Sequence, residues 1–381
     1  MRVLHILKTS VGAAWALREI RELVKLGIDV HVALPPGGPL VGRYSESGAT
    51  EHIMQFDFPV RKPWNFPMVA RRFRQLVEQL SPDIIHSHFV GTTLTMRLAL
   101  GRNHAVPRVF QVPGPLHLEN PFFRRAEIVT AGSLDFWIGS CRWTCQRYKQ
   151  SGIPNDRIFL SYYGCDLDHL QLGERGFLRS ELGLSETVKI IGMVAFIYAP
   201  KRYLGQKRGL KGHEDLIDAV KLCLKAYPNI RCVMVGGPWD NATNYERSVK
   251  RYARQHCGDR VTFLGTRDDI PNIYADIDVA VHPSHSENVG GAGESCLLGV
   301  PTIATKVGGF PDIVHDGITG WLVPPKNPKA LAKAMLEALH NPMEAQRRAQ
   351  DGQKLAKQLF DVRRTAAEIV DIYKEICPCC S

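Results

Sequence analysis

Long hydrophobic runs are missing from this sequence of 381 residues. The longest apolar stretch, from Ile190 to Pro200, has eleven residues, whereas a membrane-spanning helix needs about 20. The opening segment MRVLHILKTS turns polar too soon for a signal peptide and is typical of a β-strand. We therefore expect a cytoplasmic protein without a membrane span.

Common nucleotide-binding and nucleic-acid-binding patterns are also missing. The sequence has no dinucleotide motif with three spaced glycines and no Walker-type GKS or GKT tripeptide, which argues against a nicotinamide-dependent enzyme. The formal net charge of +10 comes without a helix-turn-helix, RNP-type or zinc-finger pattern. Nucleic acid is therefore not expected as a partner.

A repeated cysteine spacing of the kind that marks disulfide frameworks or metal sites is absent. The ten cysteines are scattered, so we expect reduced thiols, and the cluster at 377–380 has no nearby histidine or second cysteine pair to complete a metal site. Two Asp-x-Asp pairs, Asp166 with Asp168 and Asp276 with Asp278, could ligate Mg²⁺ or Mn²⁺. Their positions favour caps and turns instead, so we expect no metal.

What the sequence does contain is a regular alternation of strand-like runs with amphipathic helical stretches. In the first half, strands are predicted at residues 3–7, 30–35, 83–88, 108–114, 136–140 and 158–164, and helices at 14–26 and 69–80. This alternation is typical of βαβ units around a parallel sheet. It breaks in the polar stretch 166–188, where we place a domain boundary.

The second half restarts the same alternation. Strands are predicted at 189–197, 230–237, 261–265, 279–284 and 301–309, with a helix at 212–224. The sequence therefore predicts an α/β protein with two Rossmann-like domains, residues 1–168 and 186–360, and a final helix within 361–381 that crosses back onto the first domain. Such sheets bind ligands at the carboxyl ends of their strands, so we expect a shared site between the domains.

The glycine-rich segment SHSENVGGAGESCLLGVP, residues 284–301, carries the clearest functional signal. Closely spaced glycines cost backbone entropy and add no packing, so we expect a ligand to approach the amides of Gly290 and Gly291. A helix is predicted to start at Glu294. Its carboxylate either complements the helix dipole or accepts hydrogen bonds from neutral hydroxyls such as those of a ribose.

Other candidates follow predicted strands. The loop at 201–211 is either an exposed basic surface or a site for a diphosphate, and within it Lys211 stands out because it precedes Gly212 at a helix start. Gly12 lies between the first strand and the first helix, where Rossmann domains bind polar groups. Three histidines are predicted at strand ends, with His117 the strongest candidate for substrate contact: His86, His88 and His117.

A basic and aromatic patch is predicted in the first domain. It suits anionic lipid headgroups or is a solvated helix face, and it consists of Arg61, Lys62, Arg71, Arg72 and Arg74 beside Trp64, Phe66 and Phe73.

The segment Val261–Pro325 closely resembles the donor-binding segment of the family-four retaining glycosyltransferases of GT-B fold. KGHEDL at 211–216 also matches, and weaker similarity in TSVGAAW, DIIHSH and YYGCD extends the resemblance over essentially the whole chain. It implies two Rossmann-like domains facing each other across a cleft, the first for the acceptor and the second for a nucleotide-diphosphate sugar. It implies no cofactor and no metal.

The resemblance also implies roles for individual residues. Glu294 would bind the donor ribose and Glu287 the donor sugar, although the family has seven residues between its glutamates and this chain has six, which places Ser286 at the ungapped position. The family's diphosphate-binding arginine is replaced by Met193, so Arg208 or Lys201 would act beside Lys211. The remaining donor contacts implied are Asn288, Gly290, Gly291, Gly12 and Thr266.

The implied chemistry is retaining sugar transfer by Glu287, His117 and Lys211, with His117 taking the place of a family histidine that falls near Pro113. The acceptor is expected to be a glycan or lipid-linked precursor in cell-surface polysaccharide or glycolipid assembly, at the inner face of the cell membrane. A soluble small-molecule acceptor is the alternative. A nucleotide-sugar epimerase of the same architecture and a non-catalytic nucleotide-sugar-binding protein are the rival functions.

Overall fold

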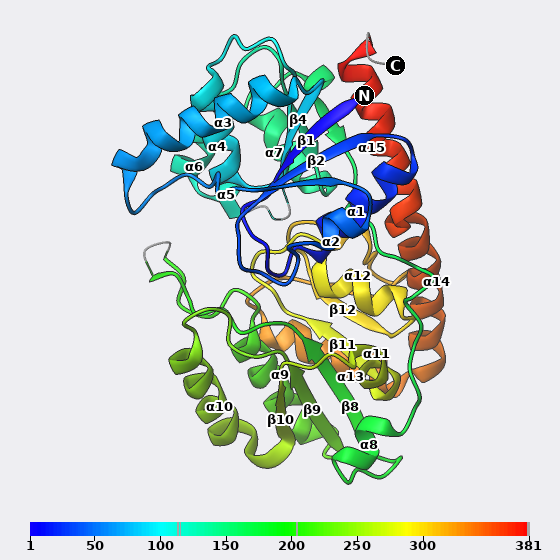
Figure 1. The fold of residues 1–381 in the computed structure, drawn as a ribbon. Coiled ribbons are helices and arrows are strands. Elements are labelled where there is room, and N and C mark those ends of the chain that lie inside the picture. Colours follow the sequence, from blue (N-terminus) through cyan, green and yellow to red (C-terminus); the bar gives the residue numbers. More distant parts are fainter. Residues whose placement is uncertain (113, 115, 203–204, 379–381) are drawn as a thin grey trace. The chain divides into compact units, whose positions relative to one another are not determined.

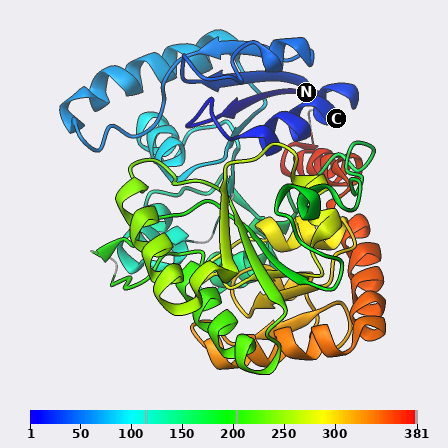
Figure 2. The ribbon, with the colours of Figure 1, turned by 90° about the horizontal axis from the view of Figure 1, so that it is seen from below.

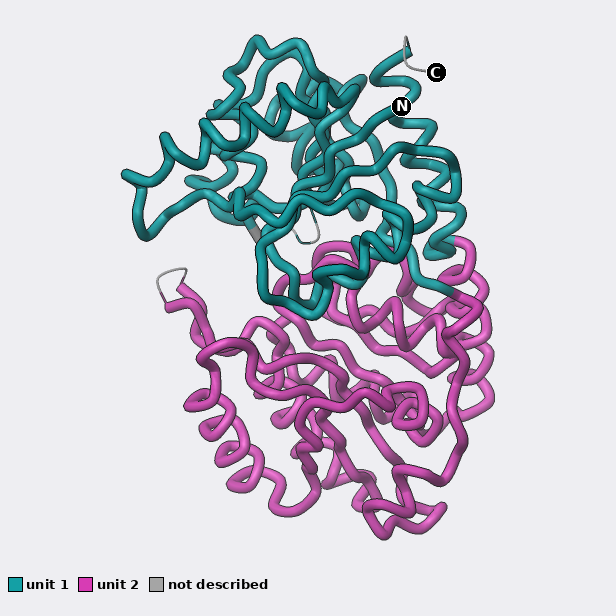
Figure 3. The backbone as a smooth tube through the Cα atoms, in the orientation of Figure 1, with its two compact units in different colours: residues 1–166, 359–381 teal, residues 167–358 magenta. Residues whose placement is uncertain are grey.

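The structure is a computed structural model that describes residues 1–381 except 113, 115, 203–204 and 379–381. The chain divides into two compact units, residues 1–166 with 359–381 (unit 1) and residues 167–358 (unit 2) (Figure 3). Among the positions discussed above, Pro113, Cys379 and Cys380 lie outside the described residues.

Unit 1 is built on a parallel sheet of seven strands in the order β3-β2-β1-β4-β5-β6-β7 (Figure 1). Val3 of the first strand in the chain lies opposite Val30 on one side and Ile84 on the other. The strands are β1 (Arg2–Ile6), β2 (Asp29–Leu34), β3 (Thr50–Ile53), β4 (Ile84–Ser87), β5 (Arg108–Val112), β6 (Asp135–Gly139) and β7 (Ile158–Leu160).

Helices cover both faces of this sheet because successive strand residues point to opposite faces (Figures 1 and 2). Val3 packs in a core with Ile20 and Ile369, whereas Leu4 packs with Phe73 on the other face. The helices of unit 1 are α1 (Ala14–Lys25), α2 (Arg43–Glu46), η1 (Pro63–Asn65), α3 (Phe66–Leu80), α4 (Val90–Leu100), α5 (Leu116–Glu119), α6 (Pro121–Val129), α7 (Arg142–Gln150), η2 (Asn155–Arg157) and α15 (Val362–Ile376).

Unit 2 repeats this plan on a parallel sheet of six strands in the order β10-β9-β8-β11-β12-β13. The strands are β8 (Lys189–Val194), β9 (Ile230–Val235), β10 (Val261–Gly265), β11 (Val279–His282), β12 (Thr302–Thr305) and β13 (Trp321–Val323). The helices are α8 (Phe177–Glu181), α9 (His213–Ala226), α10 (Thr243–Cys257), η4 (Gly258–Arg260), α11 (Ile270–Asp276), α12 (Gly290–Leu297), η5 (Phe310–Asp312), α13 (Pro328–His340) and α14 (Pro342–Phe360).

The sheet of unit 2 is also buried on both faces. Ile191 packs with Leu216 and Met335 on one face, and its neighbour Ile190 packs with Tyr274 on the other. The predicted α/β class with two Rossmann-like domains is therefore confirmed. None of the described helices combines the length and the apolar character needed to cross a membrane.

The predicted start of a helix at Glu294 is wrong, because α12 begins four residues earlier, at Gly290. The polar stretch 166–188 also contains a short helix, α8. Glycines have low helix propensity, so the sequence pattern placed the start of α12 after its glycines.

Candidate active site

A pocket of about 280 Å³ lies within unit 2, where the carboxyl ends of β8, β9, β10 and β11 meet. Parallel sheets bind their ligands at this edge. Five of the residues predicted to act on the donor line the pocket: Lys211, Thr266, Glu287, Gly291 and Glu294.

Lys211 and Glu287 form an ion pair on the pocket wall. The Lys211 Nζ atom contacts the Glu287 Oε2 atom, and both side chains are mostly buried. The backbone amide of Asn288 donates a hydrogen bond of 3.1 Å to Glu287 Oε1. Lys211 Nζ also lies 5.7 Å from the centre of the Tyr198 ring, a distance at which the ring face attracts a cation.

Gly212 explains how Lys211 reaches this position. A Cβ atom at residue 212 would lie 2.1 Å from the backbone oxygen of Pro283, so only glycine lets the start of α9 pack against the segment after β11. The φ angle of Gly212 is +75°, a value that also favours glycine. The close approach brings Lys211 beside Glu287, which is 76 positions further along the chain.

Gly290, Gly291 and Gly293 belong to the first turn of α12 rather than to a loop before it. A Cβ atom on Gly291 would lie 2.9 Å from the His282 ring, so the glycine allows the helix start to pack against the end of β11. Since Gly291 lines the pocket, the positive end of the helix dipole lies at the pocket wall, where it favours an anion.

Glu294 lies in the second turn of α12 and lines the pocket. The prediction that it sits in the first turn, where it would complement the dipole, is therefore wrong. Ser286, at the ungapped family position, is buried, whereas Glu287 lines the pocket. The one-residue shift of the first glutamate therefore still leaves a carboxylate on the pocket wall.

Arg208 is held by carboxylates next to the pocket. Its Nη1 atom lies 2.5 Å from Asp215 Oδ1 and 2.8 Å from Asp218 Oδ2. Asp215 also accepts from His285 Nε2 at 2.5 Å. Burial lowers the pKa of Arg208, but the two carboxylates outweigh this effect and raise it. The contact of Arg208 with a diphosphate stays a prediction. The same holds for the diphosphate contact of Lys201, which is exposed.

Two further predicted residues support the pocket without lining it. The backbone oxygen of Asn288 accepts a hydrogen bond of 2.9 Å from the Gly309 amide. A Cβ atom on Gly290 would lie 3.1 Å from Glu287 Oε1. Both residues therefore set the position of Glu287.

The predicted site residues of the first domain lie in unit 1. His117, on α5, is buried, and its Nε2 atom lies 3.2 Å from the Tyr148 hydroxyl. Burial lowers the pKa of His117 to about 4, and the backbone of Gly114 partly offsets this effect. Gly12 lies between β1 and α1. The roles of His117 and Gly12 stay predictions.

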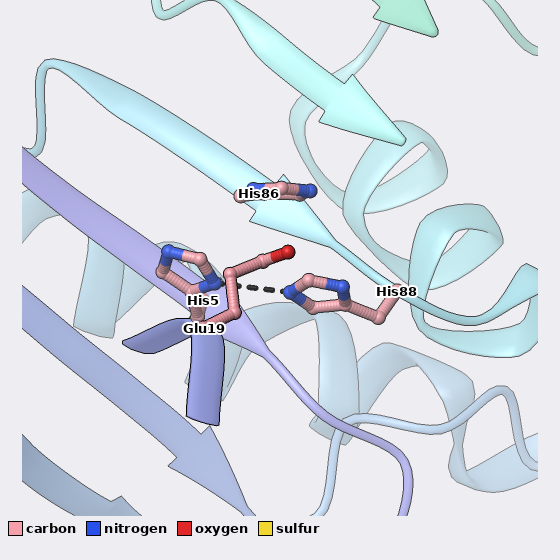
Figure 4. Close-up of side chains that lie close together, drawn as sticks. All are labelled: His5, Glu19, His86 and His88. Atoms are coloured by element: carbon pink, nitrogen blue, oxygen red, sulfur yellow. Dashed lines mark hydrogen bonds between the residues drawn. The ribbon is translucent and has the colours of Figure 1, made fainter. Parts of the chain in front are cut away.

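His86 lies on β4, His88 directly follows it, and both are fully buried; their predicted contact with substrate stays a prediction. Burial lowers the pKa of both rings well below the usual value, and the neighbouring histidines lower it further. They lie beside His5 and Glu19 (Figure 4). Burial also raises the pKa of Glu19 to about 8, while the Gln111 amide acts in the opposite direction.

The Asp-x-Asp pairs act within the fold. Asp276 accepts hydrogen bonds from the amides of Gly176 and Arg179 at the start of α8, at 2.7 and 3.0 Å. Asp278 accepts from the Ile190 amide at 2.8 Å. Asp166 pairs with Arg21 at 2.8 Å.

Several pocket residues were not singled out in the sequence. Tyr198 and Phe196 follow β8, and Ser284 follows β11, so the rule that ligands bind at carboxyl strand ends could have indicated them. His282 is buried, its Nε2 atom lies 3.0 Å from Ser295 Oγ, and burial lowers its pKa to about 3. Arg267 also lines the pocket and pairs with Glu181 and Asp269.

Comparison with known proteins identifies relatives of both halves of the chain. The family model "Glycosyltransferase Family 4" matches residues 13–169 and "Glycosyl transferases group 1" matches residues 202–355. A D-inositol 3-phosphate glycosyltransferase of Saccharomonospora viridis is 30% identical over 220 residues, which cover 56% of this chain and 48% of the relative. The chain thus spans about half the length of this curated relative.

Two solved structures share the fold across nearly the whole chain. The Anabaena protein Alr3699/HepE, solved in complex with UDP and glucose, has a TM-score of 0.81 at 20% identity and covers 98% of this chain and 99% of its own. A putative UDP-N-acetylglucosamine 2-epimerase of Listeria monocytogenes has a TM-score of 0.64 at 16% identity, with coverage of 98% and 95%. With both halves matched by glycosyltransferase models, the chain belongs to the family-four glycosyltransferases of GT-B fold.

Proposed function

We propose that the chain is a retaining glycosyltransferase that moves a sugar from a nucleotide-diphosphate sugar to a hydroxyl acceptor. The observation that carries this proposal is the pocket of unit 2, where Lys211, Glu287 and Glu294 line one wall together with the start of α12. This set offers a cation and a helix N-terminus to a diphosphate, and two carboxylates to hydroxyl groups.

Each group has a distinct part in donor binding. The diphosphate competes with Glu287 for the Lys211 ammonium and also faces the amides at the start of α12. Ionised carboxylates only accept hydrogen bonds, so Glu294 accepts from the ribose hydroxyls and Glu287 from the sugar hydroxyls. The amide of Asn288, which donates to Glu287, fixes the orientation of that carboxylate.

The transfer step follows from the same charges. The bond between the sugar carbon and the diphosphate oxygen breaks, and negative charge develops on the leaving phosphate. Lys211 and the α12 amides stabilise that charge because they are already oriented toward it. The acceptor oxygen bonds to the same face of the sugar, and its proton passes to the leaving phosphate. We propose that these groups suffice without a metal ion, and that His117 contacts the reacting sugar.

The acceptor is a separate part of the proposal. The curated relative is named for transfer to D-inositol 3-phosphate, which favours a small soluble acceptor. The patch in unit 1 favours a glycan or lipid-linked acceptor at an anionic membrane, because Trp64 is 72% exposed and Arg61 and Lys62 are exposed. Phe73, predicted as part of this patch, is buried in the core instead. Basic and aromatic side chains together suit a lipid surface.

A turnover assay with paired acceptors tests the proposal. The release of nucleoside diphosphate is measured with UDP-, GDP- and ADP-sugars as donors. The acceptor is either inositol phosphate or an acceptor lipid in anionic vesicles, and each reaction is repeated with a chelator. Acceptor-dependent release that survives the chelator and yields the retained anomer supports the proposal. Release of nucleoside diphosphate or isomerisation of the sugar without acceptor favours an epimerase, and a putative epimerase shares this fold. Binding of the nucleotide sugar without turnover favours a non-catalytic protein.

A further inference from the structure

Three histidines and one glutamate form a buried cluster in unit 1 (Figure 4). His5 lies on β1, Glu19 on α1 and His86 on β4, and His88 directly follows β4. Each offers one potential ligand atom, and these atoms all lie within 4.8 Å of one another. All four residues have no exposed surface.

Inside the cluster, two of the facing atoms are paired only with each other and the others have no partner in the part of the chain that the structure describes. His5 Nδ1 and His88 Nε2 form a hydrogen bond of 3.0 Å. Among the described residues, His86 Nε2 and both carboxylate oxygens of Glu19 have no hydrogen-bond partner, and Figure 4 shows the carboxylate reaching between the rings of His86 and His88. The Gln111 amide lies near enough to affect the pKa of Glu19 and of His86 but is not in hydrogen-bonding geometry with either. Buried polar atoms are almost always paired. A cation at the centre would pair all of these atoms at once.

The outer nitrogens of the three rings are held by tyrosine hydroxyls. The Tyr373 hydroxyl of α15 lies 2.6 Å from His86 Nδ1 and 3.3 Å from His5 Nε2. The Tyr163 hydroxyl lies 3.2 Å from His88 Nδ1. Metal-binding histidines almost always donate their second ring nitrogen to an oxygen atom, which fixes the tautomer and leaves the other nitrogen free to ligate.

We propose that His5 Nδ1, His86 Nε2, His88 Nε2 and a carboxylate oxygen of Glu19 bind a Zn²⁺ ion. Zn²⁺ binds histidine nitrogen and the carboxylate oxygen of Asp or Glu, and four protein ligands make a closed, tetrahedral site of the structural kind. The ion ties β1, β4 and α1 together and, through Tyr373, fixes α15 to unit 1. It takes no part in sugar transfer, so this inference stands independently of the proposed function.

Metal content and zinc affinity of the full chain test the proposal. The protein is produced with zinc, dialysed against a moderate chelator, and measured for bound zinc by mass spectrometry. We expect about one equivalent per chain, and a lower thermal midpoint after removal with a strong chelator that is restored by Zn²⁺. Glu19→Gln, which keeps the size of the side chain, should lose the bound ion. Tyr373→Phe should bind zinc about 10- to 100-fold more weakly.

The control is a second histidine pair in the same unit. His31 Nδ1 and His52 Nε2 lie 2.9 Å apart, so His52→Gln removes a similar ring from outside the cluster and should keep the zinc. Co²⁺ in place of Zn²⁺ should give the visible bands of tetrahedral cobalt, and Glu19→Gln should abolish them. The proposal would be overturned if the wild type held less than a tenth of an equivalent of zinc. It would also be overturned if the wild type and Glu19→Gln held equal amounts of zinc. If Glu19→Gln does not fold, the zinc content and chelator response of the wild type decide.

Discussion

At the scale of single residues, the pocket of unit 2 depends on one ion pair. Lys211 contacts Glu287, and a diphosphate in the pocket would take the place of that carboxylate beside the ammonium. The pair therefore keeps both charges neutralised and oriented in a largely buried place, where leaving either one unpaired is costly.

Replacing Lys211 tests the role of its charge. Lys211→Met keeps most of the side-chain length and removes the cation that would stabilise the leaving phosphate. We expect kcat/KM to fall by about 10²- to 10³-fold, as when one oriented donor is removed from an enzyme active site. Lys207→Met, in the same basic loop but exposed, is the control and should keep nearly full activity in the release assay. Equal losses in both variants would show that only the net charge of the loop matters.

The sequence predicted many of the residues of this pocket but not how they meet. Glu294 and Lys211 were predicted from the glycine turn and the basic loop, Glu287 was implied by the family resemblance, and all three line the pocket. Lys211 and Glu287 are separated by 76 positions in the sequence, and a local sequence pattern cannot predict a contact between residues so far apart in the chain. For the same reason the cluster of His5, Glu19, His86 and His88 was not predicted, although His86 and His88 were singled out.

At the scale of elements, helix starts position the chemistry. Lys211 directly precedes Gly212, the N-cap of α9, and the start of α12 carries the amides at the pocket wall. The strands were predicted from their apolar runs, because burial on both faces makes those runs continuous. The start of α12 could not be predicted in this way, since packing of Gly291 against His282 overrides the low helix propensity of glycine.

A matched pair of glycine substitutions tests the position of α9. Gly212 and Gly205 both have positive φ angles, +75° and +73°, but a Cβ atom would clash with Pro283 only at Gly212 and would meet nothing within 4 Å at Gly205. Both alanine variants carry the backbone cost of about 1–2 kcal/mol. Gly212→Ala should lose about 1–3 kcal/mol more in chemical unfolding because of crowding, together with donor affinity. A similar loss in both variants would show that the close approach is unimportant.

A buried ion network joins the elements of unit 1. Arg97 of α4 lies 2.9 Å from both Glu127 and Asp135, and all three side chains are fully buried. Arg97→Met would leave two buried carboxylates without this partner, so we expect unit 1 to lose about 3–5 kcal/mol of unfolding free energy. Urea unfolding measures this loss, and Arg125→Met on the exposed face of α6 should change stability by less than about 0.5 kcal/mol. A loss below about 1 kcal/mol for Arg97→Met would contradict the account.

At the scale of the whole molecule, buried neutral histidines make stability depend on pH. The pKa of His213 is lowered to about 4 and that of His282 to about 3, in both cases chiefly by burial. Above pH 6.5 both the folded and the unfolded chain hold these rings neutral, so stability is unaffected there. Below pH 6.5 the unfolded chain binds protons that the folded chain does not, and stability falls until the folded pKa is reached.

This linkage predicts a slope that a single variant should change. Each such histidine lowers the unfolding free energy by about 1.4 kcal/mol per pH unit below 6.5. In urea unfolding of unit 2 between pH 6.5 and 5, His282→Asn should reduce the slope by that amount, whatever its effect on stability at pH 7.5. An unchanged slope would mean that His282 is protonated in the folded chain.

The central claim is that the pocket of unit 2 binds a nucleotide-diphosphate sugar, and thermal stabilisation by nucleotides tests it most directly. The full chain is heated with UDP, GDP, ADP and their sugars, beside Glu294→Gln and the exposed control Glu186→Gln. One nucleotide at about 100 times its dissociation constant should add about 2.7 kcal/mol to the wild type and to the control, and most of this gain should be lost in Glu294→Gln. No stabilisation by any nucleotide, or an equal gain in Glu294→Gln, would contradict the assignment of the pocket.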